Sequence, residues 1–256
     1  MRCLDNTHAG VGPRALRQGP TTLKVEEPEK FTLKELMERR FSAVLGADAP
    51  LMDWSLVFDE SKEMPGRQTK YIHICDRTLL RPRDMIEFCN EVLRCYNAEN
   101  QSNEKFSNEV VHQARDRYSE YLLDELDDEV GKHWPEYKDY LEAIKRVGSK
   151  DYTLDAFAAK MVEVSENFSM SPQAALERFF EFSIIGYLKP GGRGGGSQWV
   201  WRYKDNRARF DAQSDRFRVH PGLKEVLGLV QGKAAARTDH AEIDESEDLL
   251  GGRAEE

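Results

Sequence analysis

Two alternating apolar runs on either side of a glycine cluster constrain the fold of this chain more than any other feature. The runs are 186-GYLKP-190 and 198-QWVWRY-203, and 191-GGRGGGS-197 joins them. Alternation of this kind is typical of strands, and a glycine-rich link between two strands predicts a hairpin tip. We therefore expect a β-hairpin over residues 186–203.

The segments around the hairpin predict a specific order of elements. Three helical patterns and a short extended segment precede it, 216-RFRVH-220 predicts another strand after it, and residues 221–229 predict a last helix. Helix, strand, helix, helix, strand, wing, strand is the order of the winged-helix variant of helix-turn-helix. We therefore expect a winged-helix domain at residues 132–230. The helix-start residues on which this depends are Pro135, Thr153 and Ser171 with Pro172.

Residues 31–131 carry mostly helical patterns. One runs from Thr32 to Gly46, a second starts at Pro82, and a third follows Ser107. The expected fold class is therefore mainly α, with a helical subdomain at residues 31–131 followed by a winged-helix domain with a small β-hairpin. Composition predicts a flexible segment at residues 1–30 and a disordered acidic tail at residues 231–256.

The composition limits the classes of function. The 256 residues carry a formal net charge of −9, which argues against a general nucleic-acid coat, so any basic surface must be local. No apolar run is long enough for a membrane span, and the N-terminus lacks a secretory pattern, which predicts a cytoplasmic protein without a membrane partner. The four cysteines and the histidines show no metal-ligand spacing, so we expect no metal site and no disulfide framework.

The run 54-WSLVFDE-60 is similar to a strand that ends in the acidic pair of a nucleotide hydrolase. Such a pair serves a phosphate loop, and the sequence contains no G-x-x-x-x-G-K-[ST]. We therefore assign no catalytic residues, and we interpret this run as an amphipathic loop or edge strand whose Asp59 and Glu60 face solvent.

Arg81 and Arg83 flank Pro82, where an irregular segment becomes a helix. A guanidinium at a helix start can bind a phosphate through two hydrogen bonds, as an arginine finger does. The alternative is that both arginines pair with nearby carboxylates such as Asp76, Asp84 or Glu87, which is common at protein surfaces and contributes little stability.

Residues 186–224 carry nine basic and three acidic side chains, an excess of six positive charges in an acidic chain. This segregation indicates an anionic partner, and interleaved aromatic residues could stack on bases. The alternative is that the aromatic residues pack the core while the arginines face solvent. The second helix of the winged helix offers only one attractive residue to phosphate, since its Glu177 and Glu181 repel it. The candidate nucleic-acid-binding residues are Lys189, Arg193, Arg202, Lys204, Arg207, Arg209 and, on that helix, Arg178.

Four segments together carry a resemblance to a known family: TLLRPRDMIEFCN at 78–90, YSEYLLDEL at 118–126, FFEFSIIGY at 179–187 and FRVHP at 217–221. They resemble the C-terminal part of bacterial P-loop ATPases of the AAA+/STAND-like kind, several of which occur in phage-defence or DNA-processing gene clusters. The resemblance implies that residues 31–131 are lid-like and that Arg83, with Arg81 second, senses a γ-phosphate.

The phosphate loop of that family has no counterpart in this chain. A truncated gene, a misplaced start and a separate module are all open interpretations. We therefore expect a regulatory module that does not hydrolyse ATP alone and that meets ATP and magnesium only on a core supplied elsewhere. The alternative is a stand-alone winged-helix protein whose basic wing binds the DNA backbone. A third interpretation is a winged helix that makes only protein contacts.

Overall fold

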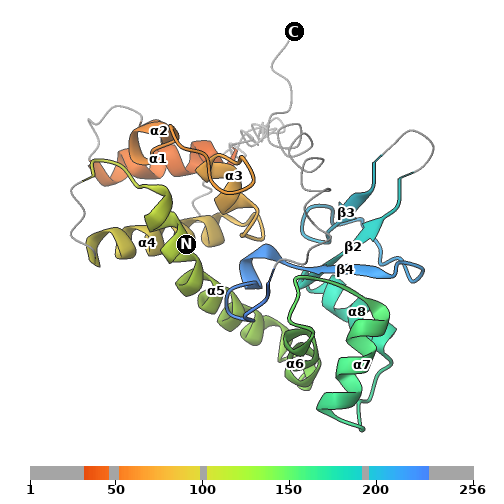
Figure 1. Cartoon of the computed structure of the whole chain (residues 1–256). Coiled ribbons are helices and arrows are strands. Elements are labelled where there is room, and N and C mark those ends of the chain that lie inside the picture. Colours follow the sequence, from red (N-terminus) through yellow and green to blue (C-terminus); the bar gives the residue numbers. More distant parts are fainter. Residues whose placement is uncertain (1–31, 46–51, 99–102, 192–195, 231–256) are drawn as a thin grey trace, which may run out of the picture. The chain divides into compact units, whose positions relative to one another are not determined.

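The computed structural model describes residues 32–45, 52–98, 103–191 and 196–230 (Figure 1). The expectations for residues 1–30, for most of the glycine-rich tip and for residues 231–256 lie outside these ranges. The described residues form eight α-helices and a four-stranded antiparallel sheet. The expected fold class, mainly helical with a small β part, is confirmed.

The first half of the described chain is helical. Helix α1 begins with a capping box, in which the Thr32 backbone N–H donates to Glu35 Oε2 at 2.8 Å and the Glu35 N–H donates to Thr32 Oγ1 at 3.2 Å. Helices α4 and α5 pack against each other over a long contact, with the rings of Phe88 and Tyr118 4.6 Å apart. The helices are α1 (Leu33–Leu45), α2 (Trp54–Val57), α3 (Lys70–Cys75), α4 (Pro82–Ala98) and α5 (Asn108–Val130).

The second half has the order expected for a winged helix. Thr153 Oγ1 caps α7 by accepting from the Ala156 N–H, and Ser171 Oγ caps α8 by accepting from the Ala174 N–H, both at 3.2 Å. The elements are α6 (Tyr137–Val147), β1 (Asp151–Thr153), α7 (Leu154–Val164), α8 (Pro172–Glu181), β2 (Ile185–Lys189), β3 (Gln198–Val200) and β4 (Arg216–Val219).

The sheet has the strand order β1-β4-β2-β3. The predicted hairpin is present, with Tyr187 of β2 opposite Val200 of β3. The strand that lies between β1 and β2 is β4, since Phe217 pairs with both Tyr152 and Tyr187. Strand β3 is therefore an edge strand of the sheet. It lies within the chain segment that connects β2 to β4, residues 190–215, and we call this segment the wing (Figure 1).

The predicted last helix from Pro221 to Leu229 is wrong. Only Pro221–Leu223 forms a short 3₁₀-helix, η1, and turns follow it. Gly222 and Gly228 explain the difference, because glycine weakens a helix and Gly228 adopts a φ of 63° that a regular helix does not allow. We call Pro221–Val230 the C-terminal strap.

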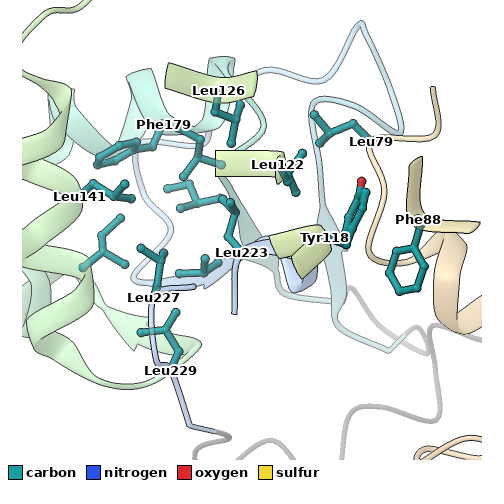
Figure 2. Packing of buried hydrophobic residues seen from close by; sticks show 14 of the residues in the cluster. Leu79, Phe88, Tyr118, Leu122, Leu126, Leu141, Phe179, Leu223, Leu227 and Leu229 are labelled. Carbon is teal, nitrogen blue, oxygen red and sulfur yellow. The ribbon is translucent and has the colours of Figure 1, made fainter. Parts of the chain in front are cut away.

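The C-terminal strap packs between elements of both halves. Figure 2 shows Leu223 of the strap on the side of Leu122 of α5, and Leu227 further toward Leu141, all within the same core. The backbone N–H of Val226 donates to Ser119 Oγ at 2.9 Å, which fixes the strap to α5. The domain limits expected from the sequence stay a prediction, and this core draws residues from both sides of the limit placed at residue 131.

Candidate phosphate-binding and nucleic-acid-binding residues

Arg81 and Arg83 lie at the start of α4, where the sequence places them. Asp84 fixes this helix start, because its buried carboxylate accepts from the Leu79 N–H at 3.1 Å. Both arginines pair with carboxylates. Arg81 Nη1 and Nη2 lie 3.2 and 3.4 Å from the two oxygens of Glu129, and Arg83 Nη2 donates to Glu125.

The partners differ from those expected. Glu125 and Glu129 belong to the acidic end of α5, which the antiparallel packing of α4 and α5 brings beside the start of α4. The side chains of Arg81 and Arg83 are 53% and 69% exposed. Exposed ion pairs are weak, so a phosphate could replace either carboxylate at little cost.

Asp59 and Glu60 do not form a hydrolase-like acidic pair. Glu60 accepts from Trp54 Nε1 at 2.7 Å and from the Lys70 N–H at 2.8 Å, so it links α2 to the start of α3 and does not simply face solvent. Lys70 is buried, and its ammonium donates to backbone carbonyls of residues 59 and 62. These contacts indicate a structural role for Glu60.

Two of the candidate arginines are held by backbone carbonyls. Arg202 donates to the carbonyls of Asn206 and Ala208, the latter at 2.9 Å, so it shapes the wing. Arg178 on α8 donates to the carbonyl of His133 at 2.8 Å and lies over the ring of Trp134. Both guanidinium groups therefore already have partners inside the molecule.

Four candidate side chains remain available to an anion. No hydrogen bond or ion pair joins them to another side chain or carbonyl within the described ranges, and each is exposed or half-buried. Arg193, a further candidate, lies outside the described residues. The four side chains are Lys189, Lys204, Arg207 and Arg209.

Two side-chain hydrogen bonds hold the later part of the wing against β2, which carries Lys189. Tyr187 and Lys189 lie on the same face of β2, and the Tyr187 hydroxyl donates to the carbonyl of Arg209 at 2.9 Å. Ser214 Oγ donates to the carbonyl of Leu188 at 3.2 Å, which holds the end of the wing against the same strand. The part of the wing that carries Arg209 is therefore fixed against β2.

The aromatic residues of the basic segment are mostly in the core. Trp199, Trp201 and Phe217 are buried, and Gly186 leaves room for the ring of Trp201, which lies against it. Arg218 is also buried, where it pairs with Asp151 and its guanidinium carbon lies 4.1 Å from the centre of the Trp199 ring. These aromatic residues cannot stack on bases without unfolding, as the core-packing alternative predicts.

The exposed face of α8 is acidic. Glu177 and Glu181 are exposed one turn apart, and Gln173, one turn earlier, donates to the carbonyl of Ala212 in the wing. Carboxylates repel the phosphate groups of nucleic acid. The helix that reads bases in many helix-turn-helix proteins is therefore a poor surface for DNA here.

A buried charged cluster was missed by the sequence analysis. Glu225 of the C-terminal strap lies 3.8 Å from Arg77 and 3.5 Å from Arg115, and all three side chains are nearly buried. Burial, together with the nearby Arg77 and Arg115 guanidinium groups, lowers the pKa of His73 to about 2. Three separate segments meet here, and no local pattern could have joined them.

An open groove of about 720 Å³ lies between the loop before α3 and the start of α5. Asn108 at the start of α5 joins the two sides of the groove, because its side-chain amide donates to the carbonyl of Glu63 at 2.8 Å. The buried Oδ1 of Asn108 has no hydrogen-bond partner among the described residues. His112, Glu109 and Arg67 also line the groove, a mixture that selects no single ligand chemistry.

Neither a metal-binding cluster nor a membrane-spanning helix is present in the described ranges. No group of three His, Cys, Asp or Glu side chains there is placed to hold a metal ion. None of the described helices combines the length and the apolar character that crossing a membrane requires.

Comparison with known proteins gives one match. Residues 32–127 match the family model of the FunZ-associated C-terminal helical domain. The matched segment runs from the start of α1 into α5, includes Arg81, Arg83 and Glu125, and is less than half of the chain. No curated protein and no solved structure matches the chain. The helical half is thus similar to a domain described as C-terminal and helical, and the resemblance to P-loop ATPases stays a prediction.

Proposed function

We propose that this chain is a non-catalytic binding module whose wing contacts the phosphate backbone of nucleic acid. The observation that carries the proposal is the contrast within one basic segment. Arg178, Arg202 and Arg218 have partners inside the molecule, whereas Lys189 and Arg209, with Lys204 and Arg207, present charge to solvent.

The same geometry favours backbone contact over base reading. The exposed face of α8 repels phosphate, and the tryptophans are buried, so neither offers a surface for base edges or base stacking. Positive side chains on a loop bind phosphate groups with little dependence on sequence. We therefore expect weak selectivity and strong salt dependence.

The test is the affinity of the chain for a duplex DNA oligomer at several salt concentrations. Reversing two charges, as Arg207→Glu with Arg209→Glu, should lower affinity at least tenfold at about 50 mM salt and reduce the salt slope by about two. Arg117→Glu changes an exposed arginine of α5 away from the wing, and it is the matched control. Equal loss in the control, or no loss in the double variant, would overturn the wing as the contact element.

A second role is favoured by one further observation, the exposed arginine pair at the start of α4. We infer that Arg83, with Arg81, acts as a phosphate sensor in a regulatory module that works beside the nucleotide-binding core of a P-loop ATPase. Their partners Glu125 and Glu129 are surface carboxylates that a phosphate can replace. ATP and magnesium belong to the core in this account.

NMR signals of the guanidinium groups test this role. Millimolar triphosphate should shift the signals of Arg81 and Arg83 but not those of Arg146, which forms a similarly exposed pair with Glu142 on α6. Equal shifts at all three arginines would show only general ion binding. Calorimetry should detect no tight, magnesium-dependent binding of ATP by the chain alone, and such binding would contradict a core supplied elsewhere.

A further inference from the structure

The basic wing has an acidic counterpart in the same sequence. Residues 231–256 carry eight acidic and three basic side chains, and the run 239-DHAEIDESED-248 contains six acidic residues and no basic one. The wing lies within residues 186–224, which carry nine basic and three acidic side chains, so we expect attraction between this segment and the acidic run.

The chain enters the acidic segment from a point close to the sheet. Val230 is bridged to Ser149, directly before β1, and its carbonyl accepts from the Lys150 N–H at 3.0 Å. Strands β1 and β3 are at opposite edges of the sheet, with β4 and β2 between them. Strands β1 and β3 are therefore three strand spacings apart, which is about 14 Å.

The connecting length is sufficient for the two segments to meet. Asp239 is the ninth residue after Val230, and an extended chain of nine residues spans about 30 Å. A short connection also creates an effective concentration on the order of 1 mM, so even weak attraction is enough for occupancy.

We propose that the acidic run at residues 239–248 binds the wing of the same molecule and competes there with nucleic acid. The carboxylates would take the positions of phosphate groups beside Lys189, Arg207 and Arg209. The competition rests on the proposed function, because it requires that nucleic acid binds the wing. The intramolecular contact itself does not depend on that function.

The first experiment measures the contact without nucleic acid. All six acidic residues of the run are changed to their amides in the full chain, and a synthetic peptide of residues 236–250 is titrated into this variant at low salt. Binding with a Kd on the order of 1 mM or below is expected, since the effective concentration in the intact chain is of that order. The Arg207→Glu, Arg209→Glu pair should abolish binding, and Arg117→Glu should leave it intact.

The second experiment measures the competition. The neutralised variant should bind the duplex DNA oligomer at least about twofold more tightly than the unchanged chain at low salt, because an effective concentration equal to the Kd leaves half of the wing occupied, and the difference should shrink as salt rises. Peptide binding without any DNA binding would leave the contact standing and overturn the proposed function. DNA binding that neutralisation does not alter, together with no peptide binding at several millimolar, would overturn this inference and leave the proposed function standing.

Discussion

His73 and His220 are two buried histidines that remain neutral in the folded chain. Burial lowers the pKa of His220 to about 3, and its Nδ1 accepts from the Gly222 N–H at 3.1 Å, which requires a neutral ring. His73, beside Arg77, has a pKa of about 2. Neither ring is therefore suited to acid–base chemistry near neutral pH.

These histidines predict how stability depends on pH. Their pKa values are depressed on folding, so only the unfolded chain takes up protons as pH falls below its ordinary histidine pKa of about 6.5. The free energy of unfolding should therefore decrease by about 2 to 3 kcal/mol between pH 7 and 5.5, and be fully present above that window. Urea unfolding at each pH measures this.

A variant and a control isolate the contribution of His73. His73→Gln should reduce the slope between pH 6 and 5 by about 1.4 kcal/mol per pH unit, because one protonation is removed. The unchanged chain, measured over the same pH range, is the control. An unchanged slope in His73→Gln would show that this ring titrates equally in both states.

At the residue scale, the sequence predicted which arginines stand at the helix start but not their partners. Pro82 and its neighbours form a local pattern, whereas the carboxylates that bind Arg81 and Arg83 lie 48 and 42 residues further along the chain. Their proximity follows from the packing of α4 on α5. A search of neighbouring carboxylates could not find them.

At the scale of elements, most helix starts were predicted better than the last helix. Thr153 and Ser171 accept the hydrogen bonds expected of caps, since capping depends on three or four consecutive residues, whereas Ser107 precedes α5 without a side-chain cap hydrogen bond. The strap is not a helix, because Gly222 and Gly228 weaken one and packing on α5 fixes another conformation. Strand β3 is likewise shorter than the run 198–203 predicted.

The ion pairs between α4 and α5 predict a small effect on stability. Arg83→Ala should change the free energy of unfolding by less than about 0.5 kcal/mol, because the pair with Glu125 is exposed. The contrasting variant is Arg218→Ala, which leaves the buried Asp151 without its partner and should cost about 3 to 5 kcal/mol. Chemical denaturation of both variants at one pH compares them, and a large loss in Arg83→Ala would contradict a weak pair.

At the scale of the whole molecule, the strap holds the two halves of the described chain through a close contact. A Cβ added at Gly222 would lie 2.2 Å from the carbonyl oxygen of Arg77 and 2.7 Å from a methyl group of Leu122. The backbone of Arg77 cannot move away from such a Cβ as easily as the end of a flexible side chain could. Gly222→Ala should therefore destabilise the chain by about 3 kcal/mol, as overpacking does.

Urea unfolding followed by both tryptophan fluorescence and circular dichroism measures the effect. Gly196→Ala is the matched control, because a Cβ there would meet nothing within 4 Å. Stability equal to that of the control would show that the strap can shift away from Arg77 without cost.

The candidate site was predicted in part for a related reason. Charge segregation is visible in composition, so the basic wing could be nominated from the sequence. The sequence could not predict which arginines already have a partner inside the molecule. The partners of Arg178 and Arg218 are His133 and Asp151, which lie 45 and 67 residues away in the chain. Only the folded chain separates the available charges from the occupied ones.

The position of the strap also has a consequence for biosynthesis. Leu223 and Leu227 complete the apolar core beside α5, yet they are translated about a hundred residues after it. Until they leave the ribosome, the face of α5 around Leu122 has no covering partner from the strap. The nascent chain therefore exposes an apolar face of α5 while about a hundred further residues are translated, which is a reason for a chaperone to bind it before folding is complete.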